Sequence, residues 1–103
     1  MLVIIDEKTF KDKITKKIWE GNFLKKGLSK EIQQRALDEM FLLFSFGTSL
    51  ERLDAIFGSK NFKSLKGDRK EQHSIRVNDQ YRLCFKWENN RIKELEFNKH
   101  YWD

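Results

Sequence analysis

The stretch HSIRVNDQYRLCFKW, residues 73–87, decides the fold of this chain. Apolar residues alternate with polar ones in residues 75–77 and again in 81–87, on either side of the turn signal Asn78-Asp79-Gln80. A period of two is the pattern of a strand that buries one face and exposes the other. The sequence therefore predicts an antiparallel hairpin with Ile75 and Leu83 on its buried face.

The segments that flank this hairpin extend the sheet. Asn89-Asn90 predicts a second tight turn, because asparagine tolerates left-handed backbone angles. Residues 92–97 then form another strand, with Leu95 and Phe97 inward and Glu94 and Glu96 outward. We expect three or four antiparallel strands in the second half of the chain.

The first half of the chain is predicted to be mainly helical. Leu2 to Ile5 is apolar and β-branched, which predicts a short buried strand. Asp6 is placed to cap a helix in which Phe10, Ile14 and Ile18, spaced by four, share one face.

Two further helices follow before the sheet. Ser29 is a favourable N-cap, and Gly47 ends the helix that it starts. The buried stripe of that helix consists of Ile32, Ala36, Met40 and Leu43. Thr48 or Ser49 starts a shorter helix that ends at Gly58 and points Leu50, Leu53 and Phe57 inward. The predicted class is α+β in one domain, residues 1–103: a strand, two helices, a short helix and then three or four antiparallel strands, with the helices on one face of the sheet.

Composition limits the class of protein. The 103 residues include nine Phe, three Trp and two Tyr, enough aromatic bulk for one small core. Cys84 is the only cysteine, so no disulfide forms within the chain, and a reducing cytoplasm is the expected location. The apolar run at residues 1–5 lacks the features of a signal peptide, and FLLFSF at 41–46 is too short to span a membrane.

The positive charge is concentrated in one segment. The net charge is +5, and residues 60–86 alone hold eight Lys or Arg against three Asp or Glu, which accounts for all of it. A basic surface attracts phosphate backbones through counterion release. A basic surface that only keeps a small domain soluble is the alternative.

The alternation of the hairpin groups these charges. If the helices cover the face of Ile75 and Leu83, then Arg76, Arg82 and Lys86 share the opposite, open face. Cations fixed on a rigid sheet form a preorganised phosphate site. A solvated sheet face without a ligand is the other reading of the same pattern.

Three motifs resemble the HigB branch of the RelE-like toxins. They are Leu65-Lys66-Gly67-Asp68-Arg69, Ser74-Ile75-Arg76-Val77 and Tyr81-Arg82. The resemblance implies a βααβββ fold and a bacterial toxin that cleaves messenger RNA in the ribosomal decoding site, by attack of a 2′-hydroxyl on the adjacent phosphate, with no metal or cofactor. It also implies a neutralising partner, a HigA-like helix-turn-helix antitoxin, in a toxin–antitoxin hetero-oligomer without membrane association.

The resemblance assigns roles to individual residues. Arg82 matches the arginine that binds the scissile phosphate, and Arg76 matches a basic position on the preceding strand. Lys66 matches the lysine of the glycine motif. Arg69 and Lys86 complete the predicted set of phosphate-binding residues.

The proton-transfer groups are assigned less uniquely. HigB toxins carry a catalytic histidine where this chain has Lys63, and they end in acid-Tyr-His where this chain has Lys99-His100-Tyr101. A His-Tyr ending is similar to that of the YoeB branch, where the pair is catalytic. The unperturbed pKa of His100 lies near neutrality, and that of Tyr101 lies near 10. Lys63, His100 and Tyr101 are therefore the catalytic candidates, with base and acid left open.

Two other functions are consistent with the same sequence. One is a toxin of the ParE kind, which shares the fold but poisons DNA gyrase without cutting RNA. Another is a catalytically silent nucleic-acid-binding module. Neither His73, expected at the surface, nor Cys84, expected to be structural, has metal-ligand spacing with His100, so no zinc site is predicted.

Overall fold

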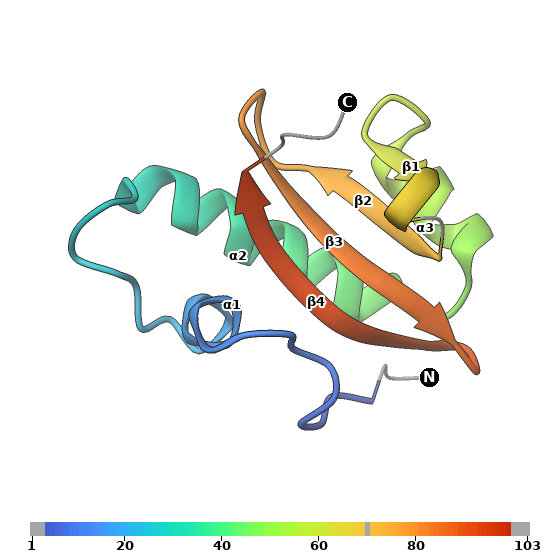
Figure 1. The fold of residues 1–103 in the computed structure, drawn as a ribbon, viewed down its shortest axis with the longest axis horizontal. Coiled ribbons are helices and arrows are strands. Elements are labelled where there is room, and N and C mark those ends of the chain that lie inside the picture. The colour runs from blue at the N-terminus through green and yellow to red at the C-terminus, as the bar shows by residue number, and fades with distance from the viewer. Residues whose placement is uncertain (1–3, 70, 100–103) are drawn as a thin grey trace.

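The computed structural model describes residues 4–69 and 71–99, which form three helices, a short 3-10 turn and a four-stranded sheet (Figure 1). In chain order the elements are α1 (Lys13–Trp19), α2 (Lys30–Phe46), α3 (Leu50–Phe57), β1 (Phe62–Ser64), η1 (Gly67–Arg69), β2 (Gln72–Arg76), β3 (Tyr81–Glu88) and β4 (Arg91–Lys99). The strands lie in the order β1-β2-β3-β4, and each neighbouring pair is antiparallel. The predicted α+β class is confirmed.

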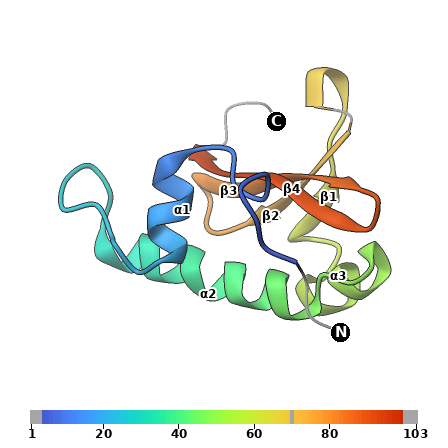
Figure 2. The same cartoon turned by 90° about the horizontal axis from the view of Figure 1, so that it is seen from below.

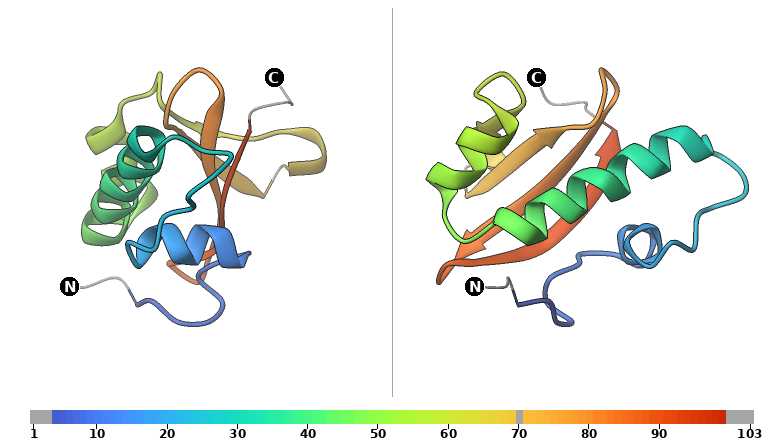
Figure 3. Two further views of the ribbon diagram at one scale, coloured as in Figure 1. Left: turned by 90° about the vertical axis from the view of Figure 1, so that its left-hand side faces the viewer. Right: turned by 180° about the vertical axis from the view of Figure 1, so that it is seen from behind.

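The helices lie on one side of the sheet. Figure 2 shows α2 and α3 below the sheet and the η1 turn rising from the opposite face. In Figure 3, α2 runs diagonally across the back of the sheet and α1 fills the corner between α2 and β4. The layering predicted from the alternation of the strands is therefore present, and within the described residues it leaves the other face of the sheet without an α-helix.

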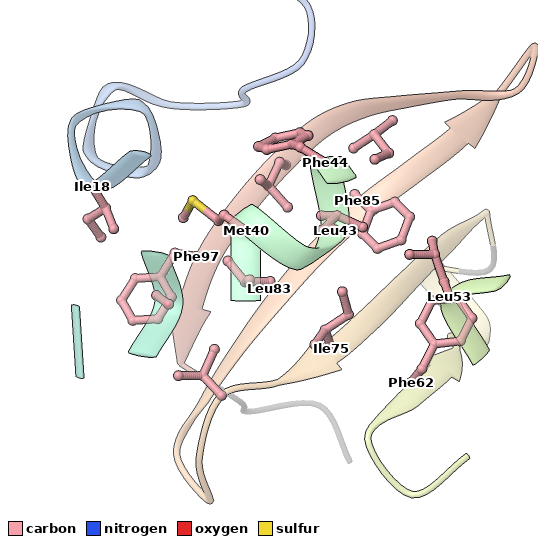
Figure 4. Packing of buried hydrophobic residues seen from close by; sticks show 14 residues of the cluster. Ile18, Met40, Leu43, Phe44, Leu53, Phe62, Ile75, Leu83, Phe85 and Phe97 are labelled. Carbon is pink, nitrogen blue, oxygen red and sulfur yellow. The ribbon is translucent and has the colours of Figure 1, made fainter. Parts of the chain in front are cut away.

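The hydrophobic core lies between α2 and the sheet. Met40 and Leu43 of α2 project toward Leu83 and Phe85 of β3, and all four side chains are fully buried (Figure 4). Burial of side chains of this size contributes about 1.5–3 kcal/mol each, so this contact supplies much of the stability of the fold.

Both hairpin turns form where the sequence predicts them. In the β2–β3 turn, Asn78 Oδ1 accepts hydrogen bonds from the backbone N–H groups of Gln80 and Tyr81, at 2.9 and 2.8 Å. In the β3–β4 turn, Asn89 and Asn90 have φ angles of 52° and 60°. Left-handed angles at both positions are those of the two-residue turn that best matches the twist of a hairpin.

A bulge in β4 keeps its apolar residues on the buried face. Between the pairs Cys84↔Glu96 and Lys86↔Lys93, β4 contains one residue more than β3. Glu94 lies in this bulge with a φ of 52°. The extra residue reverses the alternation, so that the strand buries Ile92 before the bulge residue and Leu95 after it.

The N-terminal strand is the part of the prediction that is wrong. Leu2 and Val3 lie outside the described residues, while Ile4 and Ile5 are in no strand and are 59% and 41% exposed. Phe10 instead forms a parallel bridge with Leu95 of β4. The pairing with β4 thus lies several residues later in the chain than the apolar run.

The first helix also begins later than predicted. Asp12, not Asp6, is its N-cap, and Asp12 Oδ1 accepts the Thr15 N–H at 2.8 Å. Asp6 caps a turn instead, because its Oδ1 accepts the Lys8 N–H at 2.9 Å. Of the predicted helical stripe, Phe10 precedes the helix, Ile14 is exposed and Ile18 is fully buried.

The second and third helices agree with the prediction. The hydroxyl groups of Ser29 and Ser49 cap their first turns at 3.0 and 3.1 Å. The helices end at Gly47 and Gly58. A Cβ on Gly47 would clash with the backbone carbonyl oxygen of Leu43 and would also lie 2.8 Å from the Ile92 side chain, which explains why glycine stands at this contact between α2 and β4.

Thr15 connects α1 to the sheet, and its removal tests this connection. Its hydroxyl accepts the buried N–H of Phe97 at 3.0 Å and donates to Asp12 Oδ1 at 2.7 Å. Thr15→Val keeps the volume but leaves the Phe97 N–H without an acceptor, so we expect the free energy of unfolding to fall by about 1–3 kcal/mol. Urea denaturation measures the loss. The exposed Thr48→Val serves as the control, and an equal effect of the two substitutions would contradict the assignment.

Candidate nucleic-acid interface

The sheet face opposite the helices, called the outer face below, carries polar and basic residues from all four strands. Strand register arranges them in three rows: Arg76, Arg82 and Asn98; Lys63, Ser74, Cys84 and Glu96; and Gln72, Lys86 and Lys93. The register thus brings Arg76, Arg82 and Lys86 together on one face, as the alternation in the sequence requires.

Two arginines lie side by side at the turn end of the β2–β3 hairpin. Arg76 and Arg82 are directly paired across the two strands. Arg76 forms an ion pair with the exposed Asp79, and Arg82 donates to the carbonyl oxygens of Asn78 and Tyr81. Like charges at directly paired positions destabilise a sheet, so this arrangement favours an anion that binds between them.

Arg69 lies across the outer face from η1 to β4. Its guanidinium donates to Gln72 Oε1 at 3.0 Å and to Glu96 Oε1 at 3.4 Å, and Lys11 contacts the same Glu96 oxygen at 3.4 Å. Burial raises the pKa of Glu96, but a hydrogen bond from Asn98 and the charges of Lys11 and Arg69 outweigh burial and hold the pKa below its usual range. Glu96 is therefore ionised at neutral pH and fixes η1 over the sheet.

Cys84 lies in the middle of the outer face and is fully buried. Burial raises the pKa of its thiol to about 12, against the lowering effect of the Arg69 charge. The thiolate needed for a nucleophile is therefore absent at neutral pH. This agrees with the structural role predicted for Cys84.

The predicted lysines lie at different depths. Lys86 forms an ion pair with Glu94 at 2.9 Å, and the hydrogen bond and charge of Glu94 raise the pKa of Lys86. Lys63 is exposed on β1 opposite Ser74, and Lys66 is exposed in the loop before η1. Arg69 and Lys86 also line one hollow beside η1, together with Gly67, Asp68, Glu71 and Gln72.

The remaining catalytic candidates follow the end of β4. Lys99, the last described residue, is paired with Tyr81, which precedes Arg82 on β3. His100 and Tyr101 lie outside the described residues, so their roles stay predictions.

His73 differs from its prediction as a surface residue. It is half-buried on the helix-facing side of β2, with its ring stacked on Phe62 at 5.5 Å and tilted against Phe85 at 5.7 Å. Its Nδ1 lies 3.2 Å from the Ser64 hydroxyl oxygen. Burial lowers the pKa of His73, so the ring is neutral at neutral pH and faces away from the outer face.

Glu39 is a charged residue that the sequence analysis missed. It lies on α2, and its Oε2 atom is buried without a hydrogen-bond partner among the described residues. Burial raises the pKa of Glu39 to about 7, although the charges of Arg35, Arg76 and Arg82 lower it. The signal was available, because Glu39 follows Ala36 by three residues and falls within the buried stripe of the helix.

Neither a metal-binding cluster nor a helix able to cross a membrane occurs in the described part of the chain. The described residues contain no group of three or more His, Cys, Asp or Glu side chains that could hold a metal ion. Within the same residues, none of the helices combines the length and the apolar character needed to cross a membrane.

The fold and the outer face define a small α+β protein with a basic sheet face that is left open by its helices. The family model of the RelE-like toxin HigB of type II toxin–antitoxin systems matches residues 8–100. The chain therefore belongs to the HigB-like toxin family, and as a type II toxin it pairs with a cognate antitoxin. A comparison with curated proteins gave no match.

The raised pKa of Glu39 makes the stability of the protein depend on pH. The folded-state pKa of about 7 exceeds the ordinary value of 4.5, so this group contributes stability below pH 4.5 that is lost as the pH rises through 7. Glu39→Gln keeps the neutral form at every pH. We expect it to raise the free energy of unfolding at about pH 8 by on the order of 1–2 kcal/mol, with little change near pH 4.5.

Urea denaturation at the two pH values measures this effect. Asp54→Asn is the matched control, because Asp54 is exposed on α3 and is not one of the charges that act on the carboxyl of Glu39. A loss of stability in Glu39→Gln at high pH would show that the buried carboxylate is stabilising and would contradict this assignment.

Proposed function

We propose that this protein is the toxin of a type II toxin–antitoxin system and that it inhibits translation by cutting messenger RNA on the ribosome. Membership of the HigB-like family supports the toxin role. The observation that carries the nuclease proposal is the cross-strand pair of Arg76 and Arg82 on the outer face. A fixed pair of guanidinium groups matches the two non-bridging oxygens of a phosphodiester.

The proposed reaction takes its nucleophile from the substrate. The ribose 2′-oxygen forms a bond to the adjacent phosphorus while the bond from phosphorus to the 5′-oxygen breaks, which leaves a 2′,3′-cyclic phosphate and a 5′-hydroxyl. One group accepts the 2′-hydroxyl proton and another protonates the leaving oxygen. Arg76 and Arg82 stabilise the charge that develops on the phosphate, a contribution that is often the largest in such reactions.

The proton-transfer groups in this proposal are Lys63, His100 and Tyr101. Lys63 is exposed on the outer face. It lies on β1, the neighbour of β2, and in the row next to that of Arg76. Two other titratable side chains are poor candidates, because His73 faces the helix layer and the Cys84 thiol has a pKa of about 12. Each positioned acid or base contributes about 10²–10⁴-fold to such a reaction.

We further propose that the antitoxin is a HigA-like helix-turn-helix protein and that it forms a hetero-oligomer with this chain in the cytoplasm. The excess positive charge of residues 60–86 favours a partner that brings acidic side chains to this part of the surface, because opposite potentials steer association.

Removal of Arg82 tests the proposed site. Arg82 is half-buried and bonds to the hairpin turn, so Arg82→Ala is expected to cost about 1 kcal/mol of stability and to remain folded. Its single-turnover cleavage of messenger RNA on programmed ribosomes should fall on the order of 10²–10³-fold, because a cation at the reacting phosphate is lost. Arg52→Ala, which removes the same charge from α3, should cleave at the parental rate.

The outcomes of this experiment distinguish the alternatives. Cleavage by Arg82→Ala at the parental rate would show that the phosphate binds elsewhere. Unchanged messenger RNA ends after induction of the parental protein, together with stalled complexes of gyrase on DNA, would instead identify a toxin of the ParE kind. Binding of RNA without cleavage, with or without ribosomes, would identify a silent binding module.

His100→Ala and Tyr101→Phe test the proposed proton transfer. Both substitutions should slow single-turnover cleavage while ribosome binding stays at the parental level, because docking does not depend on proton transfer. Ribosome co-sedimentation measures binding, and primer extension measures cleavage. A proportional loss of binding and cleavage would show that these residues hold the substrate and do not transfer protons.

A further inference from the structure

A second concentration of positive charge lies outside the outer face, in α1 and the segments on either side of it. Residues 8–30 hold eight lysines against two acidic residues, Asp12 and Glu20, a balance of +6. The balance of residues 60–86 is +5, and the rest of the chain carries −6. The net charge of +5 therefore conceals a second basic segment that is at least as strong as the first.

The fold brings these lysines to one edge of the molecule and exposes them. The three lysines of α1 occupy the side of the helix opposite the buried Thr15 and Ile18. Helix α1, the loop of residues 20–29 and the first turn of α2 lie together at the edge that is on the left in Figure 1 and faces the viewer in the left view of Figure 3. The name lysine edge is used below for the surface of six exposed lysines: Lys13, Lys16, Lys17, Lys25, Lys26 and Lys30.

The lysine edge differs from the outer face in the partners of its charges. On the outer face, Arg76 and Lys86 form ion pairs with Asp79 and Glu94. Among the described residues, none of the six lysines of the edge has a carboxylate within ion-pair distance. Their charge is therefore not neutralised by ion pairs within the described part of the protein, and it attracts polyanions.

A buried glutamine fixes the loop that carries two of these lysines. The side chain of Gln33 on α2 is fully buried, and its Oε1 accepts the Leu24 N–H at 2.7 Å. Its Nε2 donates to the carbonyl oxygens of Leu24 and Leu28, at 3.0 and 3.2 Å. Lys25 and Lys26 lie between these two anchor points and are exposed. Because the backbone under them is already ordered, binding through these lysines costs less conformational entropy.

The composition of the edge favours a phosphate backbone over a protein or unpaired bases. Trp19 and Phe23 pack against the core, so their rings serve the fold and not the stacking of single-stranded bases. Ile14 is the one large apolar side chain of residues 8–30 that is exposed, whereas protein interfaces are rich in aromatic anchors and depleted in lysine. Residues 8–30 contain no arginine, and lysine binds phosphate as a point charge without reading sequence.

We propose that the lysine edge is a second RNA-binding surface, which binds the phosphate backbone of folded, base-paired RNA and not the strand that is cut. On the ribosome this RNA is ribosomal RNA, so the edge anchors the protein while the outer face engages the message. The inference goes beyond the proposed function, because the lysine edge lies outside the outer face and takes no part in the cleavage step.

The first test measures the affinity of full-length proteins for a short 2′-O-methyl RNA duplex, which lacks the nucleophile and is not cut. Lys25→Gln/Lys26→Gln should bind about 10- to 100-fold more weakly than the parental protein at about 0.1 M salt, because two phosphate contacts are lost. The slope of log affinity against log salt should become shallower by about 2. Lys25→Arg/Lys26→Arg keeps both charges and should bind within about twofold of the parental protein.

Arg52→Gln/Lys60→Gln is the matched control. It removes the same charge from two exposed positions that belong neither to the lysine edge nor to the proposed phosphate site. Solvent screens these distant charges, so the affinity for the duplex should change less than about threefold and the salt slope should stay the same. Equal effects of the two double substitutions would overturn the inference, because net charge alone would then explain the binding.

Cleavage on programmed ribosomes separates anchoring from chemistry. In Lys25→Gln/Lys26→Gln, the ribosome concentration that gives the half-maximal single-turnover rate should rise about tenfold, while the rate at saturating ribosomes stays within about twofold of the parental rate. Arg82→Ala should instead lose its rate at saturation, because it acts on the reacting phosphate. A fall of the saturated rate in the lysine variant to the level of Arg82→Ala would count against a role in anchoring.

The outcomes separate this inference from the proposed function. An unchanged affinity of Lys25→Gln/Lys26→Gln for the duplex overturns the inference, whatever the result with Arg82→Ala. If the parental protein cuts no RNA on ribosomes but binds the duplex through these lysines, the proposed cleavage fails and the inference stands. If the lysine variant loses its complex with the antitoxin and keeps its affinity for the duplex, the edge binds an acidic protein and the assignment to RNA is wrong.

Discussion

The pairing of Arg76 with Arg82 across the β2–β3 hairpin is the constraint on which the rest of this structure depends. A strand has a period of two, so the register that places Ile75 opposite Leu83 in the core necessarily places the two arginines together on the other face. A slip by one residue would turn one of the two strands over and place its arginine in the core. The apolar contacts with α2 therefore fix the register, and the register fixes the cationic pair.

A β-bulge and a pair of ion pairs keep the apolar and the basic face of the sheet distinct. The bulge at Glu94 corrects the alternation of β4, so that Ile92 and Leu95 both reach the core. On the outer face, Glu96 holds Arg69 and Lys11 and so fixes η1 and the N-terminal segment to the sheet. At the same bulge, the Glu94 N–H donates a hydrogen bond to the carbonyl oxygen of Lys8 at 2.9 Å. The basic surface is thus built on a rigid support.

Sequence reasoning succeeded where one local pattern decides the structure. The strands β2, β3 and β4, both hairpin turns and the serine caps of α2 and α3 follow from alternation, asparagine and hydroxyl groups that act within a few residues. It failed at the N-terminus, where two aspartates, Asp6 and Asp12, offer the same capping oxygen and the apolar run precedes the segment that pairs with β4. Which aspartate caps the helix depends on the long-range contacts of Phe10 and Thr15, and no local pattern contains these.

The same distinction applies to the candidate site. The face shared by Arg76, Arg82 and Lys86 could be predicted, because strand parity determines it. The environment of His73 could not be predicted. Strand parity places His73 on the same face as Ile75, but the sequence does not show that the buried layer extends as far as Phe62, on which the ring stacks. Glu39 could be placed on the buried stripe of its helix, but its proximity to the arginines depends on how α2 crosses the sheet.

The proposed chemistry explains why so small a chain can carry such a site. A hydrolase that supplies its own nucleophile needs a side chain, an activating base and a third group that orients the base. When the attacking oxygen belongs to the RNA, the protein has only to fix cations and proton-transfer groups against one phosphate. Two adjacent strands meet the first requirement, since Asp79 and the Asn78 carbonyl oxygen in the turn between them bond to Arg76 and Arg82.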